Sequence, residues 1–309
     1  MTDPPALGKG SRVPDRLFPA ILSRLTSVIA FVTMGALIKI AETRGARLGE
    51  LLFFRQLLAL PVVVIAVMAG PGLATLRTNR IGSHVLRTAI GLTSMAFMFT
   101  TVMLLPLAES TTIQFTVPIF ATILGALILK EPTGWHRWGA VVAGFIGVLI
   151  VAQPGSGHIP LIGAITGLTA ALMSASVSIL LRRIGQTELA TTTVFYFSVL
   201  SLPVLLPVFI IQMVPHDIQT WGLMVLIGLT GGVGQIAMTK SLTLAPVAVV
   251  VPMDYSGLLW ASLYGYLLFN VLPAPMTWLG APIIVASGLY IVWREHRRSQ
   301  ANTTAAVSQ

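Results

Sequence analysis

Asp254 is the residue in this sequence whose type and position most strongly indicate chemistry. It lies in a long apolar stretch from Ala245 to Phe269, two residues after Pro252. A carboxylate is costly to leave in lipid, so we expect it to face a protein interior or a water-filled cavity and to mark a ligand or ion pathway. Pro252 removes a backbone donor and favours a kink beside that cavity. The alternative is a structural carboxylate that is satisfied by Lys240 or by a hydroxyl group.

Amide and aromatic side chains form a second group of candidates. Gln114 and Gln235 lie in apolar stretches, where a primary amide leaves donors and acceptors unsatisfied unless polar groups meet it. Tyr255 and Trp260 have rings that can stack on an aromatic or cationic ligand, although helix packing explains Trp260 equally well. Steps of three and four residues place a polar seam on one helix face, which is formed by Thr111, Gln114, Pro118, Thr122 and Gly125.

Other charged side chains lie nearer the ends of apolar stretches. Long cations there can extend to the lipid headgroups, which is our interpretation of Lys39 and an even alternative to a ligand contact for Lys240. Arg55, which has Glu50 nearby along the chain, is expected to hold helices together or to contact a ligand. Glu109 lies beside a predicted turn and is interpreted as a solvated carboxylate, with the lining of an outer vestibule as the alternative.

Signatures of enzymes, nucleotide sites and metal sites are absent from the sequence. It contains no H-E-x-x-H, G-x-S-x-G or Walker A motif, and it has no cysteine. The histidines lie in or beside predicted connections and form no local cluster; they are His84, His136, His158, His216 and His296. We therefore expect no catalytic residue, no metal and no cofactor.

The elements that position these residues are membrane-spanning helices. Of the 309 residues, 55% are hydrophobic and only 9% are charged, and the mean hydropathy is +0.87, which is typical of an integral membrane protein. Long apolar runs rather than short alternating ones indicate helices. The net charge of +9 would suggest a nucleic-acid partner in a soluble protein, but most of the basic residues lie in connections, so we expect none.

Hydropathy predicts ten spans, which places both termini on one side of the membrane. The predicted spans are Leu17–Ile40, Leu48–Ala69, Ser83–Leu105, Ala108–Leu129, Trp135–Val151, Ile159–Leu181, Leu189–Met213, Gln219–Leu242, Ala245–Phe269 and Ala274–Val292.

The distribution of positive charge predicts that both termini are cytoplasmic. The outer connections then hold only Arg44 and Arg47. The inner segments hold all of the following: Lys9, Arg12, Arg16, Arg24, Arg77, Arg80, Arg87, Lys130, Arg137, Arg182, Arg183, Lys240, Arg294, Arg297 and Arg298.

A polar segment divides the spans into five and five. Because five is odd, similarity between the halves predicts an inverted repeat. The similarity is visible in L-P-L-A at 105–108 against L-T-L-A at 242–245, and in W-G…G-V-L-I-V at 138–151 against W-L-G…G-L-Y-I-V at 278–292. We expect an N-terminal segment at 1–16, a first repeat at 17–152, a linker at 153–159, a second repeat at 160–293 and a C-terminal tail at 294–309.

Several motifs of this sequence resemble those of a known family, the EamA-type branch of the drug/metabolite transporter superfamily. The features that match in order are Phe54, Arg55, Ala59, the Leu-Ala turn at 107–108, Pro118, Glu131, Trp138, Gly139 and Gly147. One departure is Asn270, which stands where the family often repeats its span-ending glutamate.

This resemblance implies a secondary transporter of the bacterial inner membrane that is not an enzyme. A central site would be lined by spans one, three, four, six, eight and nine and would open alternately to each side. The expected substrates are amino acids or their derivatives, which would be exported; the alternative is uptake or exchange of a nucleoside-like metabolite such as S-adenosylmethionine. A channel or an intramembrane enzyme is a further alternative. The expected partners are membrane lipid, a coupling proton or counter-substrate, and at most a second copy of the chain.

Overall fold

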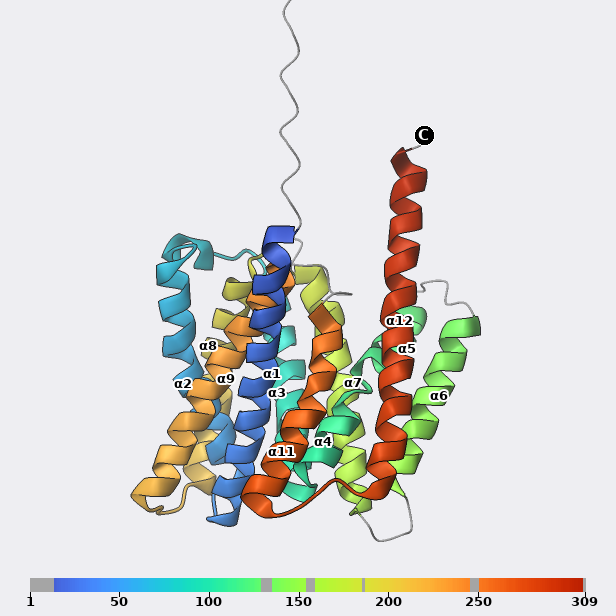
Figure 1. Ribbon diagram of the computed structural model, residues 1–309. Coiled ribbons are helices and arrows are strands. Elements are labelled where there is room, and N and C mark those ends of the chain that lie inside the picture. The colour runs from blue at the N-terminus through green and yellow to red at the C-terminus, as the bar shows by residue number, and fades with distance from the viewer. Residues whose placement is uncertain (1–13, 129–134, 154–158, 185–186, 245–249, 308–309) are drawn as a thin grey trace, which may run out of the picture.

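The computed structural model describes residues 14–128, 135–153, 159–184, 187–244 and 250–307. Within these ranges the chain is a bundle of helices without strands (Figure 1). The elements are α1 (Pro14–Thr43), α2 (Leu48–Ala69), η1 (Leu73–Leu76), α3 (Ile81–Leu104), α4 (Leu107–Gln114), α5 (Val117–Ile128), α6 (Trp135–Ala152), α7 (Leu161–Ile184), α8 (Ala190–Gln212), α9 (Ile218–Leu244), η2 (Val251–Ser256), α11 (Gly257–Phe269) and α12 (Pro275–Val307).

The helices confirm the predicted class of an all-α membrane protein. Eight described stretches are long and apolar enough to cross a membrane, and Trp138–Ala152 is a shorter apolar helix. Together with the segment formed by η2 and α11, they correspond one to one to the ten predicted spans. The bundle has a proximal end, where α1 begins and α12 ends, and a distal end, where α1 finishes at Thr43 (Figure 1).

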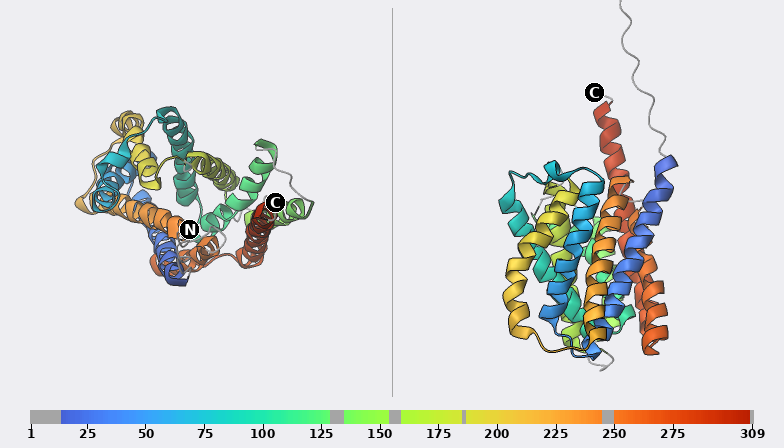
Figure 2. Two further views of the ribbon diagram at one scale, coloured as in Figure 1. Left: turned by 90° about the horizontal axis from the view of Figure 1, so that it is seen from above. Right: turned by 90° about the vertical axis from the view of Figure 1, so that its left-hand side faces the viewer.

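The packing of the helices follows the symmetry of a repeat. α1 packs along α9, and α3 packs along α7; exchanging the first five spans for the last five converts one pair into the other. The pairs α2 with α8, α6 with α12 and α4 with α11 are each converted into themselves. Seen from above, α2 and α8 lie at one side of the bundle and α6 and α12 at the opposite side (Figure 2). This arrangement fits two inverted five-helix repeats.

The fourth and ninth spans are not the continuous helices that hydropathy predicts. The fourth span is interrupted at Phe115 and Thr116, and the described part of the ninth begins as the 3₁₀ segment η2 before α11. Each break lies beside a proline, Pro118 or Pro252, which lacks an amide proton and clashes with the preceding turn. The predicted polar seam of the fourth span is therefore divided between α4 and α5. The two breaks occupy equivalent places in the two halves.

Two glycines allow helices to approach closely. A Cβ atom at Gly228 of α9 would overlap the Cβ of Leu58, so α9 packs directly on α2. A Cβ atom at Gly280 of α12 would overlap the backbone and side chain of α6 at Gly147 and Val151. Small residues at such crossings are typical of helix contacts in membranes, where close van der Waals packing drives association.

Charged side chains tie the distal end together, and two of them differ from expectation. Lys39 does not extend to lipid: its Nζ donates to the carbonyls of Val102 at 3.2 Å and Leu105 at 2.9 Å, at the end of α3. Glu109 is not solvated, because only 1% of it is exposed. One of its oxygens, Oε1, accepts from the backbone N–H of Ala274 at 3.0 Å and from the Thr277 hydroxyl at 3.1 Å. Both contacts join helices at the distal end.

Candidate functional site

A buried arginine is the partner of Asp254. Arg24 Nε donates to Asp254 Oδ1 at 2.5 Å, and Arg24 Nη2 donates to Oδ2. The two hydrogen bonds form a bidentate ion pair between α1 and η2. The side chain of Arg24 is 10% exposed and that of Asp254 is 34% exposed. The carboxylate is therefore paired on one side and open on another. Lys240, which was one of the alternative partners, is an exposed residue of α9, and Arg24 forms the ion pair with Asp254.

The sequence analysis counted Arg24 among the basic residues that mark the inner side of the membrane. Its interpretation as a connection charge was wrong. Arg24 lies inside the first span, seven residues after Leu17, and is 8% exposed. Its position within an apolar run is the signal that could have identified it. The same holds for Arg87, which was also counted as an inner connection charge and is 5% exposed within α3.

The broken spans meet through an aromatic pair. The rings of Phe115 and Tyr255 pack edge to face, with centroids 5.0 Å apart and planes at 76°. The Tyr255 hydroxyl points at α12, where a Cβ atom on Gly288 would overlap it, and it has no hydrogen-bond partner among the described residues. Because Tyr255 follows Asp254 directly, the aromatic pair and the ion pair form one polar and aromatic centre at the breaks.

Gln114 and Thr111 border the same centre from α4. Gln114 precedes Phe115 and is half-buried, and its Nε2 atom has no hydrogen-bond partner within the part of the chain that the structure describes. Thr111 lies against the start of α11, because its methyl carbon is 3.5 Å from the place of a Cβ on Gly257. The sequence therefore identified Thr111, Gln114, Asp254 and Tyr255 as candidates, and the structure brings these four close to the two breaks.

Gln235 and Trp260 share no hydrogen bond or ring contact with this centre among the described residues. Gln235 is 8% exposed and makes no side-chain hydrogen bond to a described residue. It lies one helical turn after Gly231, which packs against Met34 and Arg55. Trp260 is half-buried in α11 and has no ring contact or hydrogen bond with another described candidate.

Arg55 belongs to a separate buried cluster of α2, α3 and α8. Its Nη1 donates to Gln56 Oε1, and Gln56 Nε2 donates to Ser201 Oγ at 2.8 Å. Glu50 does not pair with it, because both Glu50 oxygens lie 3.0 Å from His216 Nε2. The cluster also holds Arg87, and sequence reasoning recognised only one of the two arginines.

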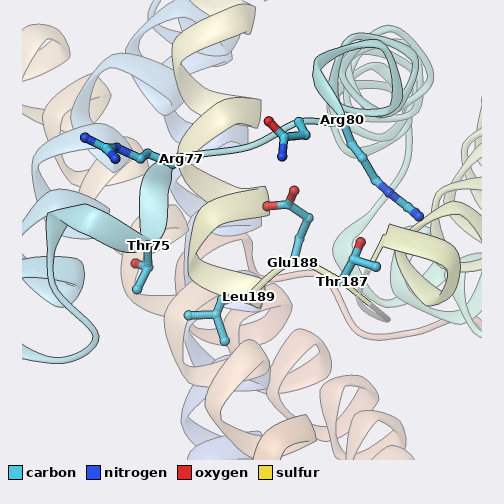
Figure 3. A pocket seen from close by; sticks show the side chains of 7 residues that line it. Thr75, Arg77, Arg80, Thr187, Glu188 and Leu189 are labelled. Atoms are coloured by element: carbon cyan, nitrogen blue, oxygen red, sulfur yellow. The ribbon is translucent and has the colours of Figure 1, made fainter.

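A cavity at the proximal end was not predicted. It has a volume of about 510 Å³ and lies between the η1–α3 and α7–α8 connections. Figure 3 places Glu188 between Arg77 and Arg80. The residues that line the cavity are Thr75, Arg77, Asn79, Arg80, Thr187, Glu188 and Leu189, which include none of the predicted site residues. Glu188 Oε1 accepts a hydrogen bond from the Thr78 hydroxyl at 2.6 Å. Within the described ranges, no group of acidic and histidine residues is arranged to hold a metal ion.

Comparison with known proteins relates the chain to bacterial transporters. It is 28% identical to a riboflavin transporter of Vibrio cholerae over 91% of this chain and 95% of the relative. It is 28% identical to an S-adenosylmethionine uptake transporter of Rickettsia prowazekii, over 79% and 81%. A pseudopaline exporter of Pseudomonas aeruginosa is 24% identical over 89% and 96%. One crystal structure, 16% identical, superposes with a TM-score of 0.62 over 88% of this chain and 97% of that one, and so shares the fold.

The family match extends across both halves. The model of the EamA-like transporter family matches residues 18–153 and again residues 161–293. The double match coincides with the two five-helix repeats that the packing indicates. The relatives are transporters of small molecules and not enzymes. By its sequence, its helices and its internal repeat, this chain belongs to the EamA-like transporter family.

Proposed function

We propose that this transporter takes up a small metabolite that combines a flat heteroaromatic ring with a polar tail. The observation that carries the proposal is the edge-to-face pair of Phe115 and Tyr255, which lies where the two broken spans meet. Such rings offer stacking surfaces to a planar ligand. Riboflavin and S-adenosylmethionine, which the names of two relatives specify, share this combination of flat ring and polar tail.

The polar groups at the same breaks suit the tail of such a ligand. The free Gln114 amide can donate to a ring carbonyl or nitrogen. The carboxylate of Asp254 is paired with Arg24 but is still partly exposed. It can therefore accept hydrogen bonds from hydroxyl or ammonium groups of a ligand while the ion pair remains intact. If the substrate binds one arrangement of the repeats more tightly than the other, its binding would shift the equilibrium between the inward-open and outward-open states.

The remaining features of the proposal follow from the sequence. Transport is secondary, because the sequence carries no nucleotide-binding motif. We further propose that a proton or a counter-substrate is coupled to it. The membrane is the bacterial inner membrane, with both termini in the cytoplasm. The two repeats occupy 17–152 and 160–293, joined by a linker at 153–159, with terminal segments at 1–16 and 294–309. The transporter acts as a monomer or a homodimer.

A screen of thermal stabilisation followed by uptake into proteoliposomes tests the substrate class. Riboflavin, S-adenosylmethionine and a set of amino acids are added to the purified protein, since a ligand that binds only the folded state raises its Tm. Compounds that stabilise are then assayed as radiolabelled substrates. The proposal fails if only non-aromatic compounds stabilise the protein and are transported.

Variants of the aromatic pair and its amide sharpen the test. Tyr255→Leu and Gln114→Leu should each raise the KM for the heteroaromatic substrate about tenfold or more, because a stacking surface or a hydrogen bond is lost. Tyr255→Phe keeps the ring and should retain uptake. Phe120→Leu is the matched control, since Phe120 forms an edge-to-face pair with Phe145 between α5 and α6. An equal loss in the control would assign the effect to helix packing.

A second candidate is the export of amino acids or their derivatives. The ion pair of Arg24 and Asp254 favours it, because an α-amino acid carries both complementary charges and can pair with both groups. The same screen separates the two candidates, because this one predicts stabilisation by amino acids that lack an aromatic ring.

A further inference from the structure

Two arginines lie inside the bundle against one phenylalanine. Arg55 of α2 is 6% exposed and Arg87 of α3 is 5% exposed. Their guanidinium carbons lie 5.8 Å and 3.6 Å from the centroid of the Phe197 ring in α8. Arg55 is seven residues from the start of α2 and Arg87 is six from the start of α3, so each lies about 10 Å inside its span. Both charges are thus in the hydrocarbon region.

Neither arginine has an acidic partner in the described part of the chain. The nearby carboxylates are engaged elsewhere: Glu50 contacts His216 and Glu188 accepts from Thr78. Asp254 is taken by Arg24. Three nitrogens of these two guanidinium groups lack a hydrogen-bond acceptor among the described residues, namely Nε of Arg55 and Nε and Nη1 of Arg87.

Two buried hydroxyl groups, on α3 and on α8, also lack a hydrogen-bond partner in the described ranges. They belong to Thr88, which follows Arg87, and to Ser198, which follows Phe197. The ring of Phe197 attracts the cations, but a cation–π contact leaves the N–H groups in the guanidinium plane unused. The cluster therefore offers several donors and two positive charges without a matching acceptor.

An acceptor in such a place would lower the free energy of the folded protein. A buried, unpaired charge is strongly destabilising, and two like charges that share one ring also repel each other. An anion between the guanidinium groups would satisfy the free N–H donors with charge-assisted hydrogen bonds.

We propose that Arg55 and Arg87 form a binding site for a compact inorganic anion of the halide or phosphate class. The proximal cavity lies at the end of α3 from which Arg87 is six residues away. Arg77 and Arg80 line that cavity, and His84 lies one helical turn from Arg87 towards it. His84 is fully buried, and its Nε2 lies 3.9 Å from Oε2 of Glu188 at the cavity. The site is separate from the aromatic centre at the breaks and stands whether or not the proposed substrate class is correct.

Anion-dependent stability of the purified protein tests this site without any transport substrate. The Tm is measured at constant ionic strength in sodium gluconate, whose anion is bulky, while chloride or inorganic phosphate replaces gluconate. A saturable rise of about 5 °C is expected at a hundredfold excess of anion over its Kd, because the anion binds only the folded state. Absence of a rise with both anions overturns the proposal.

Variants distinguish the proposed site from general salt effects. Arg87→Gln and Arg55→Gln should abolish the anion-dependent rise, and in gluconate each should be at least as stable as wild type, because an unpaired buried charge has been removed. Arg80→Gln alters an exposed arginine of the cavity and should keep the full rise. Arg87→Lys keeps the charge but not the planar fork and should weaken anion affinity about tenfold. An undiminished rise in Arg87→Gln or in Arg87→Lys overturns the proposal, and the Lys variant decides if the Gln variant does not fold.

Discussion

The ion pair of Arg24 and Asp254 is the residue-scale feature with the clearest consequence for transport. It joins α1 to η2, so it links the first span of one repeat to the broken span of the other. A partly buried pair contributes little net stability over an apolar pair, but losing one partner leaves the other charge uncompensated. Removing one partner should therefore cost more stability than removing both.

We predict that Asp254→Asn folds but loses or uncouples transport. The unfolding free energy should fall by about 2 kcal/mol, below the value for a fully buried pair, because Asp254 keeps an open side. Asn keeps the shape and removes the titratable charge, so the pH profile of any remaining flux should change. Flux into liposomes at several pH values, together with unfolding of the purified variant, measures both effects.

The double variant Arg24→Gln with Asp254→Asn is the matched control for stability. It should recover most of the lost free energy of unfolding, since no unpaired charge remains, while flux stays low. Equal rates and identical pH profiles in wild type and Asp254→Asn would show that the carboxylate is structural only.

At the scale of the elements, helix ends are fixed by specific caps. Asp217 precedes α9, and its Oδ1 accepts from the backbone N–H of Thr220 at 3.0 Å and from the Thr220 hydroxyl. These hydrogen bonds, helped by the charge of Arg44, lower the pKa of the Asp217 carboxyl below its usual value. A side-chain acceptor at this position satisfies an amide that the helix leaves unpaired.

We predict that Asp217→Ala lowers Tm at neutral pH, whereas Asp217→Asn, which keeps a capping oxygen, lowers it less. Because the folded-state pKa is depressed, the stabilisation from the charge is present above the unfolded value of about 3.9 and is lost as pH falls through the folded value. The difference in Tm between wild type and Asp217→Asn should therefore shrink below about pH 4. Melting curves from pH 7 to pH 2 measure it, and a difference that grows on acidification would contradict the assignment.

At the scale of the whole molecule, the repeat fixes which loops share a side of the membrane. The connection after α1 lies at the distal end (Figure 1). The connection containing η1 lies at the proximal end, where α1 begins and α12 ends. The bias of basic residues predicts that the proximal end faces the cytoplasm.

We predict that Thr43→Cys is labelled by an impermeant maleimide in intact bacterial cells and that Asn79→Cys is labelled only after the cells are opened. Both positions are exposed, and the chain has no native cysteine to interfere. The parent chain without cysteine is the control for background. Labelling of Asn79→Cys in intact cells, with Thr43→Cys protected, would reverse the proposed orientation.

The sequence by itself determined the helical membrane class, the ten spans and the repeat, because the length and spacing of apolar runs reflect the thickness of the bilayer. It also located Asp254, Gln114, Tyr255 and Thr111, since polar groups in apolar runs are conspicuous. Only the tertiary structure decided their partners. Arg24 and Asp254 are 230 positions apart, and no local pattern encodes such a contact.

The tertiary structure also decided which basic residues are buried. A count of charges cannot tell the buried Arg87 from the exposed Arg80, which lies seven residues earlier. Only the structure shows that Arg87 in α3 packs against the ring of Phe197 in α8. Prolines in apolar runs leave helix continuity undecided, because a proline near a span's middle can kink a helix or end it. In the structure the helix is interrupted at Phe115 and Thr116, just before Pro118, and Phe115 packs against Tyr255 in the candidate site.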